Sequence, residues 1–133
     1  MKILLLSNQG MVEPFVGNPI MIRYRDSLYN DNRIEEVRML RCKQPFKVIR
    51  ELRNDAKHVD LIHLHFGGLY ALITWVLLLG INKPKIITFH GTDIHAKAIK
   101  TSKSLLEKIR IKINQYSSFI SVLLYDKCGF VAE

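Results

Sequence analysis

Two short apolar segments of the chain each end in a histidine that is followed by glycine. Residues 60–68 read DLIHLHFGG, and residues 85–93 read KIITFHGTD. Because the carboxyl ends of parallel strands line the ligand crevice of a sheet, we expect these two endings to form one shared site. Glycine lets a backbone approach a ligand closely, and an imidazole can hydrogen-bond or transfer a proton near neutral pH. A second interpretation stays open, in which the glycines make turns and the histidines are buried structural groups.

The same histidines raise the question of a metal site. His63 and His65 lie two residues apart and so share one face of a strand, while His90, Asp93 and His95 are close in sequence. Neutral imidazoles and a carboxylate are suitable ligands for a divalent ion. None of these residues has the spacing of a specific ligand motif, so we expect no metal site.

Segments of strand and helix character alternate along the chain. Asn18 followed by Pro19 is typical of a helix start, and Leu105, Ile109 and Ile113 mark a helical stripe near the other end. Continuous apolar strands that alternate with helices predict a Rossmann-like three-layer α/β domain, with a parallel sheet and helices on both faces. The expected strands are 2–6, 36–41, 61–66, 85–89 and 118–124, and the expected helices are 19–29, 44–58, 69–79 and one around 105–113.

Length and charge limit the class of protein. The 133 residues fit one domain, 1–133, and a hydrophobic content of 48% is ample for a packed core. The formal net charge of +8 favours an anionic partner: a membrane surface, a diphosphate substrate or a nucleic acid. A nucleic acid is not expected, because the chain has no basic–aromatic stacking motif and no recognition helix.

Cysteine content and hydropathy bear on location. Cys42 and Cys128 have no paired spacing, which argues for a reducing compartment. The apolar run 1–6 is too short for a signal peptide, so we predict a cytoplasmic protein. Residues 61–82 carry no charge over about the length of a bilayer span, but histidines and paired glycines interrupt them. We therefore interpret this stretch as a strand and a helix.

Common nucleotide and hydrolase motifs are missing from the sequence. Gly10 and Gly17 are too far apart for the dinucleotide fingerprint, and no phosphate-binding P-loop is present. No serine occupies a nucleophile elbow, which removes the hydrolase triad. An ordinary dinucleotide or ATP site is therefore not expected.

These features together resemble one known family. The chain is similar to the N-terminal half of retaining glycosyltransferases with the two-domain GT-B fold, of the family 4 type. Residues 60–67 match a pattern of Asp, two apolar residues, His, any residue, His, an aromatic residue and Gly, and residues 87–93 match apolar-Thr-Phe-His-Gly-Thr-Asp. The strand 1–6 with Gly17 in the following loop, and the run 125–127, also match.

The resemblance implies transfer of a hexose from a nucleotide-diphosphate sugar to an acceptor with retention of configuration, in polysaccharide or glycolipid synthesis. It implies no metal and no cofactor, the nucleotide sugar being a substrate. The N-terminal domain of such enzymes holds the sugar or lipid-linked acceptor, and His90 matches the histidine that positions the transferred sugar and acts electrostatically at the breaking bond. The substrate-binding positions that the resemblance implies are Gly17, Asn18, His65, Gly67, Gly91, Thr92 and Asp93.

The chain departs from the family pattern at several points. Gly17 is followed by Asn18 where the family often has paired glycines, and Leu123 and Leu124 stand where Ser-Glu is frequent. The donor-binding C-terminal domain is absent from these 133 residues. Since a site with one wall neither binds its donor tightly nor excludes water, we expect the isolated chain to be inactive. A C-terminal domain or a partner subunit would supply the other wall, and an excised domain, a truncated product and a split enzyme stay open.

A basic segment, 94–115, follows the second histidine ending. Ile111 lies off the stripe of Leu105, Ile109 and Ile113, so some apolar surface is expected to face outward. A basic, partly apolar helix suits a peripheral position on anionic lipid at the inner face of a membrane, and a solvated helix face is an equal alternative. A non-catalytic basic α/β module that recruits a partner or a membrane is therefore the second function hypothesis. The basic residues, opposed by Glu107 alone, are Lys97, Lys100, Lys103, Lys108, Arg110 and Lys112.

Overall fold

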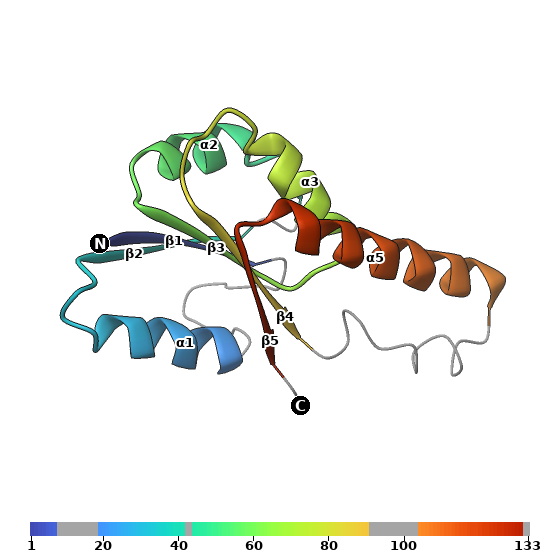
Figure 1. Cartoon of the computed structure of the whole chain (residues 1–133), viewed down its shortest axis with the longest axis horizontal. Helices are drawn as coiled ribbons and strands as arrows, with labels where there is room; N and C mark the ends of the chain where they lie inside the picture. The colour runs from blue at the N-terminus through green and yellow to red at the C-terminus, as the bar shows by residue number, and fades with distance from the viewer. Residues whose placement is uncertain (8–18, 42–43, 91–103, 132–133) are drawn as a thin grey trace.

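A computed structural model describes the arrangement of most of the chain (Figure 1). The described residues are 1–7, 19–41, 44–90 and 104–131, and the structural statements below concern these residues.

Five parallel strands form one sheet with the order β2-β1-β3-β4-β5. The first four strands in chain order are buried or half-buried along most of their length, as is typical of a parallel sheet with covered faces, whereas the edge strand β5 exposes Lys127 and Phe130. The strands are β1 (Lys2–Ser7), β2 (Glu36–Arg41), β3 (Leu61–His65), β4 (Lys85–His90) and β5 (Lys127–Val131).

Helices cover both faces of this sheet. Helix α1 lies on one face, and α2, α3 and α5 lie on the other (Figure 1). The three layers confirm the predicted α/β fold with a parallel sheet between helices. The helices are α1 (Pro19–Tyr29), α2 (Ile49–Lys57), α3 (Leu69–Leu77) and α5 (Leu105–Leu124).

The apolar core is divided by the sheet into two unequal parts. The smaller part contains Ile3, Leu5 and Val37, against which Tyr24 and Leu28 of α1 pack. The larger part faces α2, α3 and α5, and it is built from strand residues that alternate with those of the smaller part. Its fully buried members include Leu4, Leu6, Leu52, Ala56, Ile62, Leu64, Ala71, Leu78 and Ile87.

The strand order places a topological switch point between β1 and β3. From β1 the chain continues to β2 on one side, and β3 then returns to the other side of β1. Ligands of open α/β sheets bind outside the carboxyl ends of the strands at such a point. Ser7 at the end of β1 pairs with His65 at the end of β3, and β4 lies next to β3. The polar strand ends therefore meet where the topology predicts a ligand.

One predicted element is wrong. Residues 118–124 form the end of helix α5, and the fifth strand begins only at Lys127. The run contains β-branched and aromatic residues that are typical of strands. Its buried residues, however, are Ser118 and Ser121, together with Ser117, at the spacing of one helix face. Packing of these small side chains against α3 thus decides in favour of the helix.

Two helices are also shorter than expected. Helix α2 begins at Ile49, after a turn closed by the amide of Lys47 and the carbonyl of Gln44 (2.9 Å). Helix α3 ends at Leu77. The uncharged stretch 61–82 is thereby divided between β3 and α3. Among the described helices, none combines the length and the apolar character that crossing a membrane requires.

We predict that the hydroxyl of Tyr125 contributes measurably to stability. It is buried and donates a hydrogen bond to the carbonyl of Ala71 in α3 (2.9 Å). Tyr125→Phe should lower the free energy of unfolding in urea by about 1 kcal/mol, the net contribution of a buried hydrogen bond. Tyr29→Phe is the matched control, because the Tyr29 hydroxyl donates to Val37 (3.1 Å) from a side chain that is 58% exposed. An equal loss of unfolding free energy in the two variants would contradict a stabilising hydrogen bond between the buried Tyr125 hydroxyl and α3.

Candidate functional site

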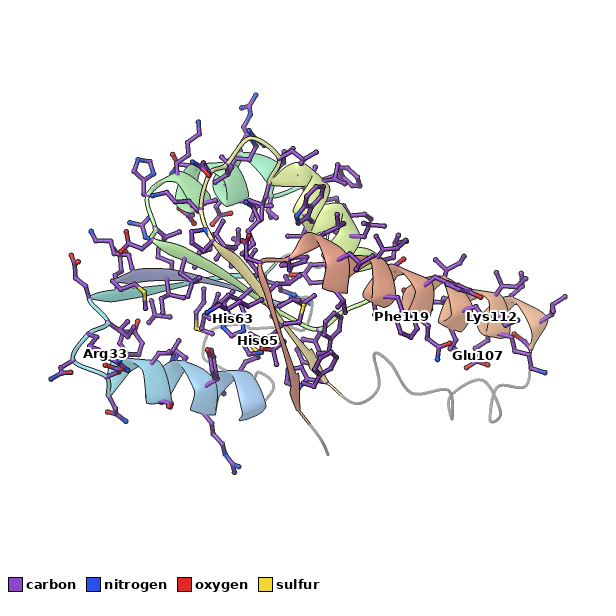
Figure 2. All side chains as sticks on the ribbon, viewed as in Figure 1. Arg33, His63, His65, Glu107, Lys112 and Phe119 are labelled. Carbon is purple, nitrogen blue, oxygen red and sulfur yellow. The ribbon has the colours of Figure 1, made fainter. Side chains whose placement is uncertain are left out.

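The polar strand ends form one buried cluster on the face of the sheet that α1 covers. His63 and His65 of β3 lie on this face (Figure 2). His65 pairs in register with Thr88 of β4, and His90 follows two residues later on the same face. Tyr24 of α1 packs its ring edge-on against both β3 imidazoles, with ring centroids 5.1 Å from His63 and 4.7 Å from His65.

One row of hydrogen bonds runs from α1 across β3 to β4. The Tyr24 hydroxyl lies 2.9 Å from Nδ1 of His63, and Nε2 of His63 lies 2.8 Å from Oγ1 of Thr88. A neutral imidazole has one donor and one acceptor nitrogen, so it matches a hydroxyl on each side. These two contacts fix the plane of the His63 ring.

A second pair of imidazoles spans the ends of β3 and β4. Nδ1 of His65 lies 3.3 Å from Nε2 of His90, and both rings are 2% exposed. The His65 ring also stacks on the His63 ring at a centroid distance of 4.4 Å. Nε2 of His65 is buried and has no hydrogen-bond partner among the described residues. His65 therefore retains one nitrogen for a further polar contact.

Burial keeps the two β3 imidazoles uncharged. Desolvation, with a smaller contribution from His90, lowers the pKa of His63 from 6.5 to about 4. Desolvation, followed by repulsion from His63 and His90, lowers the pKa of His65 to about 3. Both rings are neutral at pH 7, so they can exchange hydrogen bonds with hydroxyl groups but cannot attract an anion by charge.

The backbone at the end of β3 adopts an uncommon conformation. Phe66 has φ +74°, in the left-handed region that a side chain with Cβ adopts at a cost. Strand alternation would put its ring on the side of Leu64, in the larger core. Instead the ring stacks on His90 at a centroid distance of 4.3 Å and an interplanar angle of 29°. This turn thereby supplies an apolar wall to the His90 imidazole.

The two glycines after Phe66 allow α3 and α5 to approach the strand end. A Cβ at Gly67 would lie 2.6 Å from Cδ1 of Phe89 and 2.7 Å from the Ser118 hydroxyl, so no larger residue fits without movement. The amide of Gly68 donates to Ser118 Oγ (2.8 Å), and that of Leu69 donates to Asn114 Oδ1 (3.3 Å). These two donors at the start of α3 are thus used by α5 rather than left for a diphosphate.

A basic hollow lies at the same edge of the sheet. It has a volume of about 400 Å³ and is lined by Arg41, Gln44, Lys47 and Val48, just beyond the end of β2. Guanidinium and ammonium groups here suit an anionic ligand.

The structure brings together part of the predicted site. His65 and His90 are in contact, and Gly67 follows in the same turn. Sequence reasoning missed the roles of Tyr24, Phe66 and Thr88. The position of Thr88 could have been inferred from the sequence, since Thr88 precedes His90 by two residues and therefore lies on the same face of the strand. Gly17, Asn18, Gly91, Thr92 and Asp93 lie outside the described residues.

The part of the chain that the structure describes holds no group of three His, Cys, Asp or Glu side chains arranged for a metal ion. Asp93 and His95, which entered the metal hypothesis, lie outside that part.

The fold and the cluster define a parallel α/β domain with neutral, polar strand ends at its switch point. No family model matches the chain, and no curated protein matches it.

The lowered pKa values predict that stability falls in mild acid. Both imidazoles have a folded-state pKa below the unfolded value of 6.5, so the unfolded chain binds more protons below pH 6.5 and is favoured there. From pH 7 to pH 5 each histidine should lower the free energy of unfolding by roughly 2 kcal/mol. His65→Gln should remove about half of this pH dependence in urea titrations. An unchanged dependence in that variant would show that the fall has another origin.

Proposed function

We propose that this chain is the acceptor-side domain of a retaining GT-B glycosyltransferase. The observation that carries the proposal is the contact between His65 and His90 at the carboxyl ends of neighbouring strands. These are the two histidines of the segments that resemble the family. Their position beside a switch point is where an α/β sheet binds its ligand.

The chemistry of the cluster supports a polyhydroxylated ligand. Neutral imidazoles and hydroxyl groups donate and accept hydrogen bonds without charge, as sugar hydroxyls do. In the proposed reaction His90 lies at the transferred sugar and stabilises charge that develops as the diphosphate leaves. His65 and the stacked Phe66 ring hold the orientation of His90 from two sides. The basic hollow at Arg41 and Lys47 suits a phosphate on the acceptor.

The proposed enzyme needs a second wall. A donor-binding domain or subunit would hold the nucleotide-diphosphate sugar opposite the strand ends and exclude water from the breaking bond. Residues 1–133 alone should therefore be inactive in transfer. A cytoplasmic enzyme of polysaccharide or glycolipid synthesis, without metal or cofactor, is the setting that the family resemblance suggests.

The proposal is tested with the protein expressed from its complete reading frame, and with any partner that co-purifies. Release of nucleoside diphosphate from a panel of UDP- and GDP-sugars is measured in the presence of lipid-linked and free sugar acceptors. His90→Ala should lower kcat by about 10²- to 10³-fold, the usual effect of removing one stabilising group at a developing charge.

His58→Ala is the matched control, because His58 is an exposed histidine after α2. It should leave kcat unchanged, and circular dichroism should show that both variants are folded. Full transfer in the folded His90→Ala variant would remove this residue from the reaction. Absence of transfer with every donor would favour the non-catalytic binding module.

A further inference from the structure

Helix α5 is packed with its polar side inward and its apolar side outward. Its buried residues are Ser117, Ser118 and Ser121. Serines allow the close approach to α3 that the contacts of Ser118 with Gly68 show. Its exposed large apolar residues, with their exposed fractions, are Leu105 (74%), Leu106 (79%), Ile109 (45%), Ile113 (47%), Tyr116 (69%), Phe119 (61%), Ile120 (45%), Val122 (38%) and Leu123 (85%).

Most of these residues form one stripe along the full length of the helix. At 3.6 residues per turn, positions spaced by three, four or seven fall on one face. The N-terminal half of α5 extends beyond the sheet, so this part of the stripe has no neighbouring layer (Figure 1). We define the α5 stripe as Leu105, Ile109, Ile113, Tyr116, Ile120 and Leu123.

Basic side chains border the α5 stripe on one side. Lys108 and Lys112 lie four residues apart along this border, and both are exposed, whereas Arg110 falls on the helix face of Ser117 and Ser121. Glu107, the single acidic residue of the helix, lies on the face away from the stripe. Figure 2 shows Lys112 and Glu107 on the half of α5 that extends from the body.

One basic and two aromatic side chains line a hollow beside the stripe. This hollow has a volume of about 270 Å³ and is lined by Lys112, Gln115, Tyr116 and Phe119. An apolar stripe with a basic border and interfacial aromatic residues is the arrangement of helices that lie in the plane of a membrane surface. Tyrosine is amphipathic and is favoured at the level of the lipid headgroups.

We propose that α5 docks this protein onto an anionic lipid surface, with the α5 stripe in the headgroup–acyl boundary and Lys108 and Lys112 on lipid phosphates. A second copy of the chain fits the stripe less well, because each chain carries a net charge of +8 and the basic borders of two antiparallel copies would face each other. The proposal is independent of glycosyl transfer, since none of these residues belongs to the histidine cluster.

Vesicle flotation of the complete chain tests the proposal. At low salt, binding should be about tenfold or more stronger to phosphatidylcholine vesicles containing phosphatidylglycerol than to phosphatidylcholine alone. Ile109→Glu should lower binding to the mixed vesicles by about tenfold or more, because it puts a charge into the apolar stripe. Val76→Glu on α3 is the matched control, since Val76 is 49% exposed and Ile109 45%. This control should bind as the unaltered protein does.

A charge test uses a second matched pair. The double variant Lys108→Glu, Lys112→Glu should abolish the preference for the mixed vesicles. The control double variant Arg50→Glu, Lys57→Glu makes the same change of net charge at exposed positions of α2. This control should retain most of the preference for the mixed vesicles. Equal losses in both double variants would show attraction by net charge alone and would overturn the proposal. Absence of binding to the mixed vesicles, or self-association in sedimentation that Ile109→Glu disrupts, would overturn it as well.

Discussion

The parallel pairing of β3 with β4 sets the position of every histidine in the candidate site. His65 lies opposite Thr88, so that His63 reaches the Thr88 hydroxyl and His65 reaches His90. Because side chains alternate along a strand, a slip of one residue would turn the imidazoles of one strand into the larger apolar core. The fully buried Leu64 and Ile87, whose side chains point into that core, oppose such a slip. Apolar packing on one face therefore fixes the polar geometry on the other.

Burial of the histidine cluster costs free energy, and hydrogen bonds within the cluster limit this cost. An imidazole in an apolar environment is tolerated when it is neutral and hydrogen-bonded, and His63 has a partner on each nitrogen. His65 has a partner on one nitrogen only among the described residues. The positive φ of Phe66 adds backbone strain at the same place. Strain and incomplete pairing concentrated at a strand end are typical of functional sites, which supports a role in ligand binding.

Local patterns were sufficient to predict most of the architecture. The bounds 19–29 and 36–41 are confirmed, because a proline start and alternating apolar residues are signals within one element. The general rule on strand ends predicted one shared site for the two histidine endings, and the contact of His65 with His90 agrees with it. The contact of Tyr24 with His63 joins residues 39 apart, and no single-element pattern reports it. The stretch 118–124 was misassigned because strand-forming residue types were weighed without the serine face, which only packing against α3 shows to be buried.

Helix α5 buries serines and exposes apolar residues, and this arrangement connects the histidine cluster with the exposed surface of the domain. A helix that served only to cover the sheet would bury its apolar stripe and expose its serines. Here the serines and Asn114 hold the start of α3 and leave room for Gly67, so the inner face is fully used by the turn that follows His65. The apolar face is then unnecessary for the packing of this domain. Its extent over the whole helix, beside a basic border, is the reason to assign it to a surface outside the domain rather than to the fold.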